Sequence, residues 1–425
     1  MTKKVFPDNF FWGASTASHQ VEGRTENQWS AWELENAQYF AKHAKSRLGE
    51  FDNWDKIKNQ ATNPANYVSG RGVDHYNRYK EDFDIAKKLN LTAFRFGIEW
   101  SRIEPEEGKW DAAEIDHYRN YIAELRKRDL EPFLNIWHWT MPTWFTDKGG
   151  FEKSGNLKCW DRFVSKLMDE LGDDIKYVIT INEPNVYATF SYLTGEWPPA
   201  ATNPWSFFKV YINLVRAHKR AYSIIKKKNK KIQVGVAAQL ANLQAKRPRN
   251  IVDVSVTQFM RYWWNWWFLN RIRKQQDFIG FNYYFTDYYK NFTKENPSAP
   301  LSDLNWYMEP EGLHPLLSRV WAHYKKPIII TENGLADSAD LNRQWWIEET
   351  IVAMERALSE GIDIRGYFHW SLLDNFEWKY GWWPEFGLVQ INRQNMVRTV
   401  RPSAKWYADK IAALRKGSQP TQDNT

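Results

Sequence analysis

The sequence contains one cysteine, Cys159, in 425 residues. One cysteine excludes an internal disulfide and a cysteine-based metal cluster, and a reducing cytoplasm is the simplest location for such a chain. Long hydrophobic runs are also missing: the run at 328–331 is far shorter than the roughly 20 residues that a membrane helix needs. The basic N-terminus is followed by no apolar signal segment. We therefore expect a mature cytoplasmic protein with no membrane partner.

Two kinds of cofactor motif are absent as well. The nine histidines include no His-x-His or His-Glu-x-x-His pattern, so no metal site is expected. No Gly-x-Gly-x-x-Gly motif follows the first predicted strand, which argues against a nucleotide cofactor and against a doubly wound sheet, the second fold considered. We expect an activity that needs neither a metal nor an organic cofactor.

The charge balance is mildly basic, with 58 Lys and Arg against 51 Asp and Glu, a net charge of +7. The densest basic run, at 226–231, ends a helical pattern. Lysines there favour the helix dipole and are solvated, so a helix end is preferred over a phosphate-binding track. No nucleic-acid motif accompanies the run, and no nucleic-acid partner is expected.

What the sequence has in excess is aromatic residues: 25 Trp, 21 Tyr and 24 Phe. A buried Trp needs a partner for its indole N–H. The rings could therefore fill a large rigid core, or they could line a cleft with flat apolar faces for sugars or bases. Composition alone leaves both interpretations open. For the pairs Trp263-Trp264 and Trp266-Trp267, which fall in a helical pattern, we expect core or helix packing.

Short apolar runs of strand character alternate with amphipathic helical patterns along the chain. The predicted strands are 10–16, 92–98, 132–138, 177–182, 232–238, 278–284, 327–332 and 365–371. The predicted helices are 76–89, 115–125, 160–172, 206–228, 254–270, 311–324, 347–358 and 402–415. Eight strands, each followed by a helix, predict one α/β domain over residues 1–416, a (β/α)₈ TIM barrel. Residues 417–425 are predicted to form a disordered tail.

Two glutamates stand where predicted strands end. Glu183 follows the fourth strand and precedes Pro184, and Glu332 ends the seventh shortly before Gly334. The active site of such a barrel lies at the C-terminal ends of its strands, so we expect the two carboxyl groups to face each other across the mouth. Facing carboxyl groups are what glycoside hydrolysis requires. Two unrelated rim glutamates held in salt bridges are the alternative.

Four motifs resemble those of the family 1 glycoside hydrolases, the β-glucosidases, β-galactosidases and their relatives. They lie in order along nearly the whole chain. The first consists of FFWGAST from Phe10 and QVEG from Gln20, the second is TINEP from Thr180, the third is TENG from Thr331, and the fourth is WSLLDNFEW from Trp370. The resemblance implies that Glu183 is the general acid/base and Glu332 the nucleophile. It also implies that Arg95 and Tyr284 keep Glu332 ionised. Further implied substrate-binding residues are Gln20, His138, Trp139, Asn182, Trp370, Glu377, Trp378 and Phe386.

The activity implied by the resemblance is retaining hydrolysis of terminal β-D-glucosides, and of β-D-galactosides or β-D-fucosides, through a covalent glycosyl-enzyme. A 6-phospho-β-glycosidase and a non-catalytic sugar-binding barrel are the alternatives, and the sequence leaves the oligomeric state open. A metal-dependent barrel hydrolase is disfavoured by the missing histidine pairs. The region 239–277 is short for the family, which suggests an open cleft on the leaving-group side.

Overall fold

The structure is a computed structural model that describes residues 5–417. Residues 1–4 and 418–425 lie outside this range, so most of the N-terminal segment and of the predicted disordered tail is not described. Gly417, the first residue of that tail, has a left-handed φ of 78° and ends the last helix, α16 (Pro402–Lys416).

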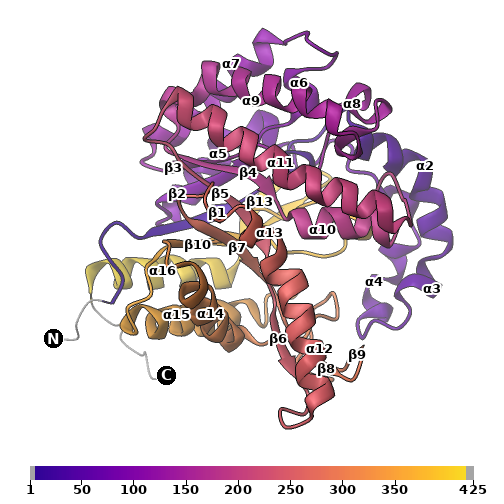
Figure 1. Ribbon diagram of the computed structural model, residues 1–425, viewed down its shortest axis with the longest axis vertical. Coiled ribbons are helices and arrows are strands. Elements are labelled where there is room, and N and C mark those ends of the chain that lie inside the picture. The colour runs from indigo at the N-terminus through magenta and orange to yellow at the C-terminus, as the bar shows by residue number, and fades with distance from the viewer. Residues whose placement is uncertain (1–4, 418–425) are drawn as a thin grey trace.

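Eight parallel strands close into a barrel at the centre of the molecule, as Figure 1 shows. Going round the barrel, the strands are β1 (Phe11–Ser15), β2 (Ala93–Gly97), β3 (Glu131–Asn135), β4 (Tyr177–Asn182), β5 (Gln233–Gln239), β7 (Ile279–Tyr283), β10 (Ile328–Asn333) and β11 (Ile364–Trp370), and β11 pairs with β1. The predicted TIM barrel is confirmed, with each strand close to its predicted place. The third strand ends earlier than predicted, so His138 lies in the loop beyond it.

A helix follows each barrel strand and packs outside it. These helices are α5 (His75–Lys88), α7 (Ala112–Lys127), α9 (Leu157–Leu171), α11 (Pro204–Lys228), α12 (Ile251–Arg261) with α13 (Trp267–Arg271), α14 (Leu313–Tyr324), α15 (Arg343–Ser359) and α16. Helix α9 buries Leu157, Trp160, Val164 and Leu171, which lie on one face at helical spacing. Gly361, with a φ of 83°, follows the end of α15, as predicted for a glycine past a helix C-terminus.

Further helices lie mostly in the loops. The α-helices are α1 (Ser18–Val21), α2 (Gln28–Lys42), α3 (Ala44–Leu48), α4 (Trp54–Ala61), α6 (Trp100–Ile103), α8 (Thr143–Asp147) and α10 (Pro184–Ala188). The 3₁₀ helices are η1 (Pro64–Tyr67), η2 (Gly150–Glu152), η3 (Ser154–Asn156), η4 (Gly172–Asp174), η7 (Pro310–Gly312) and η8 (Trp378–Tyr380), and the π-helices are η5 (Thr189–Leu193) and η6 (Tyr262–Trp266). Two small sheets pair β6 (Asn242–Ala245), β8 (Thr286–Lys290) and β9 (Thr293–Lys294), and β12 (Val389–Asn392) with β13 (Val397–Val400). Among the described helices, none is long and apolar enough to cross a membrane.

The barrel interior is filled by side chains, so the barrel is a packed core and not a pore. Residues from several strands form one buried apolar cluster: Ala93, Phe133, Ile179, Ala237, Phe278, Ile329 and Phe368. The rings of Phe133 and Tyr177 stack with their centroids 4.3 Å apart. Polar side chains replace this cluster toward the C-terminal ends of the strands, where the functional site must lie.

Candidate active site

Glu183 and Glu332 lie at the C-terminal ends of β4 and β10 and are both buried, with 5% and 3% of their surface exposed. Glu183 has a left-handed φ of 40° and is the N-cap of α10. In the barrel order, β5 and β7 separate the two strands on the shorter side. The glutamates therefore stand across part of the barrel mouth; the fourth and seventh strands, which the sequence predicts on opposite sides of the barrel, are only three places apart around it.

The turn after Glu332 is fixed by a glycine. A Cβ atom on Gly334 would lie 1.8 Å from the carbonyl oxygen of Trp370, so no other residue fits there without a shift of the backbone. Glu332 is thereby held close to the end of β11, the strand that leads to Trp370 and Glu377.

Glu332 has two donors, both predicted to contact it. The guanidinium of Arg95, fully buried in β2, forms an ion pair with Glu332 Oε1. The hydroxyl of Tyr284 donates to Glu332 Oε2 at 2.7 Å. A cation and a hydroxyl donor both stabilise the ionised carboxylate, and this environment suits a nucleophile.

Glu183 has a different environment. Its Oε1 accepts a hydrogen bond of 2.8 Å from the side-chain amide of Asn282. Burial and then the negative charge of Glu332 raise the pKa of Glu183 well above its usual value, although Asn282 and Arg95 act in the opposite direction. The protonated acid is therefore favoured at Glu183.

Asn182 joins these groups. Its Oδ1 accepts hydrogen bonds from Arg95 at 2.7 Å and from Asn282 at 3.2 Å, and its side-chain nitrogen lies 3.0 Å from Nε2 of His138. Burial, and then the charge of Arg95, lower the pKa of His138 well below its usual value, so its imidazole is neutral. A neutral imidazole and an amide can each exchange hydrogen bonds with sugar hydroxyls.

On the side of β1 and β11, Gln20 and Glu377 form a second polar group. Gln20 Nε2 donates to the carbonyl of Phe376 at 2.8 Å and lies 3.4 Å from Glu377 Oε2, which also accepts from Asn375 at 2.8 Å. Burial raises the pKa of Glu377 to about 8; Asn375 opposes this, and the charge of Glu332 adds to it. Oε1 of Gln20 has no hydrogen-bond partner within the described chain.

These residues surround a cleft of about 520 Å³. Its wall includes both glutamates and, from the predicted site, His138, Trp139, Tyr284, Trp370, Glu377, Trp378 and Phe386. Arg95, Asn182 and Gln20 are fully buried behind that wall. Among residues 5–417, no three His, Cys, Asp or Glu side chains converge as metal ligands would.

The indole N–H of Trp139 is bound within the protein. It donates to the carbonyl of Asn182 at 2.9 Å. Its ring packs against Trp378 with the centroids 4.9 Å apart. Trp139 therefore offers a ring surface to the cleft, while its N–H stabilises the backbone beside Glu183.

Comparison with known proteins identifies the family. The sequence model described as "Glycosyl hydrolase family 1" matches residues 2–274 and 269–416. The chain belongs to glycosyl hydrolase family 1. It is therefore a glycoside hydrolase, as the sequence motifs predicted.

Relatives and solved structures of family 1 match over nearly the whole chain. Beta-glucosidase A of Thermotoga maritima is 29% identical, over 97% of this chain and 98% of the relative. A beta-galactosidase of Sulfolobus acidocaldarius is 30% identical, over 80% of this chain and 84% of the relative. The structure of a beta-glycosidase from Pyrococcus horikoshii has a TM-score of 0.84 at 31% identity, covering 96% of this chain and 95% of that one.

Several residues of this family 1 cleft were not predicted. Asn282, the donor to Glu183, lies near the end of β7. Trp264 was expected to pack in a helix; it lies in η6, but it is half-buried and lines the cleft, with its indole N–H bonded to Gln239. Trp306 lines the cleft from the loop before η7. No local sequence pattern marks these positions.

Proposed function

We propose that this protein is a retaining β-glycosidase that hydrolyses terminal β-D-glucosides, and also β-D-galactosides or β-D-fucosides. The observation that carries the proposal is the contrast between the two cleft carboxyl groups: Glu332 lies between a guanidinium and a hydroxyl donor, and Glu183 is in an environment that favours the acid. Relatives named beta-glucosidase and beta-galactosidase support the choice of substrate.

In the first step, a carboxylate oxygen of Glu332 attacks the anomeric carbon of the glycone. The bond to the leaving oxygen breaks, and Glu183 gives that oxygen its proton. Arg95 and Tyr284 keep Glu332 ionised until the attack, and Asn182 holds the 2-hydroxyl, whose hydrogen bond strengthens in the transition state.

In the second step, water releases the sugar. Once Glu332 is esterified it no longer carries a negative charge, so the pKa of Glu183 falls and its carboxylate becomes a base. Glu183 takes a proton from the water that attacks the anomeric carbon, the bond from that carbon to Glu332 breaks, and Glu332 is again a carboxylate. The glycone leaves with its original β-configuration. Two inversions at one carbon give overall retention.

The remaining predicted residues bind the glycone. Gln20, His138, Glu377 and Trp378 supply polar groups for its hydroxyls. Trp370 forms the apolar floor under the ring, Trp139 adds a ring surface to the cleft, and Phe386 closes the rim. The carboxyl group of Glu377 argues against the 6-phosphoglycosidase alternative, because it offers no positive charge to a phosphate and would repel the phosphate when ionised.

A turnover assay with p-nitrophenyl β-D-glucoside, with and without a chelator, tests the proposal. We expect release of p-nitrophenol that the chelator does not change, because we propose that neither a metal nor another cofactor takes part. A panel of glucosides, galactosides, fucosides and 6-phosphoglucosides then ranks the substrates. If no β-glycoside were turned over, the non-catalytic sugar-binding alternative would be supported. If the enzyme preferred a 6-phosphoglucoside, the 6-phospho-β-glycosidase alternative would be supported.

We also propose that residues 1–416 act as one domain and that the protein is located in the cytoplasm. Its partner is a small β-glycoside or oligosaccharide, and it binds neither nucleic acid nor a membrane. The buried free thiol of Cys159 supports a reducing location. Expression of the full chain with a reporter in its native host would test this location.

A further inference from the structure

The loop between β11 and β12, residues 371–388, carries five residues of the cleft wall: Glu377, Trp378, Lys379, Tyr380 and Phe386. Apart from the 3₁₀ helix η8 and a single bridge between Leu373 and Val389, it has no regular secondary structure. Backbone hydrogen bonds of Ser371 with Phe386 and Leu388 join the two ends of the loop. Buried side-chain contacts add to these bonds.

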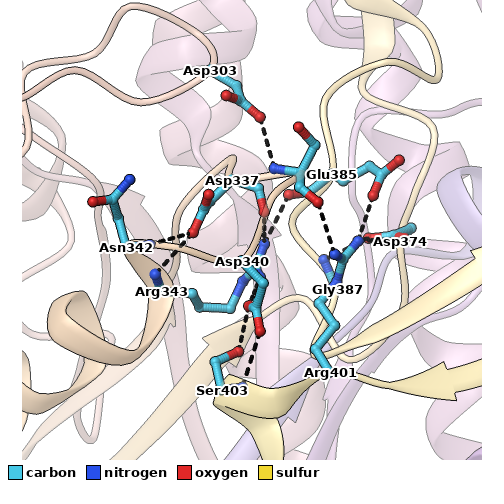
Figure 2. Close-up of polar contacts among 11 residues, drawn as sticks. Asp303, Asp337, Asp340, Asn342, Arg343, Asp374, Glu385, Gly387, Arg401 and Ser403 are labelled. Carbon is cyan, nitrogen blue, oxygen red and sulfur yellow. Dashed lines mark hydrogen bonds and ion pairs between the residues drawn. The ribbon is translucent and has the colours of Figure 1, made fainter.

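Arg401, just before α16, joins the two ends of this loop. Its Nη2 donates to Asp374 Oδ2 at 3.0 Å and forms an ion pair with Glu385 (Figure 2). Asp374 in turn accepts from the backbone N–H of Gly387 at 2.9 Å. Arg401 is only 5% exposed. One buried guanidinium thus joins Asp374 to Glu385, on either side of the segment that contains Glu377 and Trp378, in addition to the backbone hydrogen bonds of Ser371.

A second arginine attaches the same loop to the turn that follows Glu332. Arg343 Nη2 donates to the carbonyls of Glu385 at 3.0 Å and Asp337 at 2.8 Å (Figure 2). The N–H of Asp337 also donates to the carbonyl of Glu385 at 3.0 Å. Asp340 binds both Arg343 and Ser403 of α16. The loops after β10 and β11 are therefore tied to each other and to α16.

The charges explain why the arginine matters. Asp374 and Glu385 carry like charges close together, and burial raises the pKa of Asp374 to about 6, opposed by Arg401 and assisted by Glu385. Without Arg401 the two carboxylates would repel each other in a partly buried site and move apart. Phe386, which follows Glu385, packs against Tyr284 with the centroids 6.3 Å apart. Movement of the loop end would therefore reach the donor to Glu332.

We propose that Arg401, with Asp374 and Glu385, is a positioning cluster that sets the shape of the loop at 371–388 and thereby the recognition of the glycone. These residues act through Glu377, Trp378 and Phe386 and need not touch the sugar. The proposal rests on the proposed function. It extends that function to a site behind the wall of the cleft.

The test compares Arg401→Met, which keeps length but removes the charge, with wild type and with Arg401→Lys. Steady-state kinetics are measured on p-nitrophenyl β-D-glucoside and β-D-xyloside, because the xyloside lacks the hydroxymethyl group and offers the loop fewer contacts. We expect Arg401→Met to raise KM for the glucoside about tenfold and to lower the preference for glucoside over xyloside about three- to tenfold. Arg401→Lys keeps the charge but not the planar guanidinium group. Its KM and its preference for glucoside should lie between those of Arg401→Met and wild type.

Arg356→Met is the matched control, because Arg356 forms an exposed i,i+4 pair on α15 and is 68% exposed. It should leave both values unchanged. If Arg401→Met does not fold, the nearly isosteric Glu385→Gln and Asp374→Asn, each of which removes one of the two ion pairs but keeps the cation, should show a smaller loss of discrimination in the same direction. Folded cluster variants with wild-type KM and wild-type discrimination would overturn the proposal. A wild-type enzyme inactive on all β-glycosides would instead refute the proposed function.

Discussion

Glu183 and Glu332 carry the same carboxyl group in the same cleft, and their neighbours give them different chemistry. Glu332 receives a cation and a hydroxyl donor from β2 and from the residue after β7. Glu183 receives one neutral amide donor from Asn282 and is exposed to the charge of Glu332. A carboxylate held by a cation and a hydroxyl donor, beside a carboxyl group whose environment favours its protonated form, is the arrangement expected for a nucleophile and an acid.

Replacing each of the two glutamates should therefore change the kinetics in a different way. Glu332→Ala should lower kcat by roughly four to six orders of magnitude on every substrate, because no other group can form the covalent intermediate. Glu183→Ala should lose about 10²- to 10⁴-fold on unactivated glucosides but still expel dinitrophenolate, which needs no proton. Azide should then restore its turnover and yield a β-glucosyl azide. Product analysis that finds β-azide rescue in Glu332→Ala instead would mean that the roles are reversed.

Tyr284 offers a finer test of the environment of Glu332. Tyr284→Phe removes one donor to a buried charge and should lower kcat/KM about 10- to 100-fold. Tyr288→Phe is the matched control, because its hydroxyl donates to Glu309 and the residue does not line the cleft. Equal effects of the two changes on kcat/KM would argue against a special role for Tyr284.

Some of these residues could be predicted from the sequence and others could not. Glu183 and Glu332 were predictable because each ends an apolar strand beside a residue that stops the strand, Pro184 or Gly334. Asn282 was not, because an amide at a strand end has no distinctive spacing. The N–H partner of Trp139 could not be predicted either, because it depends on how two neighbouring strands lie in space.

At the scale of elements, the barrel strands were predictable because each is a short apolar run with polar residues after it. Helix α2 was missed because its buried face holds Trp29, Glu33, Ala37 and Ala41, where a charged residue and two alanines weaken the apolar periodicity. The loops were the hardest part. Their contacts, such as those of Trp264 and Trp306, are non-local.

We expect the part of the cleft wall formed by Gln239 and Trp264 to face the leaving group. Gln239 ends β5, next to Glu183, whose N–H donates to the carbonyl of Ala237 in β5 at 2.6 Å. In the barrel order, β5 lies opposite β1, which precedes Gln20. Groups beside the acid and far from Gln20 face the departing part of the substrate.

Trp264→Ala should therefore raise KM for aryl β-glucosides about three- to tenfold and change KM for methyl β-glucoside little. The reason is that an aryl ring stacks on the indole and a methyl group does not. Trp263→Ala is the control: Trp263 packs on Phe207 and Tyr211 and does not line the cleft. If both variants, or neither, lost the aryl preference in these KM measurements, the assignment of Trp264 would be wrong.

For the molecule as a whole, ionisation of two buried carboxyl groups of the cleft lowers the free energy of unfolding. Burial raises the pKa of Glu183 and Glu377, so their ionisation opposes folding. The contribution of protonated Glu377 to the free energy of unfolding is fully present below pH about 4.5, the ordinary pKa of a glutamate. It is lost as the pH rises through about 8, the pKa of Glu377 in the folded protein. The folded protein retains a proton in that range that the unfolded chain has released.

Glu377→Gln removes this titration. The variant should melt like wild type near pH 4.5 and at a temperature about 2 °C or more higher at pH 8, while losing activity through its weaker acceptor. Melting curves across this pH range check the prediction, with the exposed Glu35→Gln as control. A difference between variant and wild type that stays constant with pH, or shrinks as the pH rises, would contradict it.

The most direct measurement is to trap the covalent intermediate. A 2-deoxy-2-fluoro-β-D-glucoside with a dinitrophenolate leaving group slows both steps but leaves the first fast enough for the sugar to accumulate on the nucleophile. Peptide mass spectrometry of the inactivated protein should find one fluoroglucosyl group, on Glu332. An adduct on Glu183, or a burst of dinitrophenolate with no adduct anywhere, would contradict double displacement through Glu332.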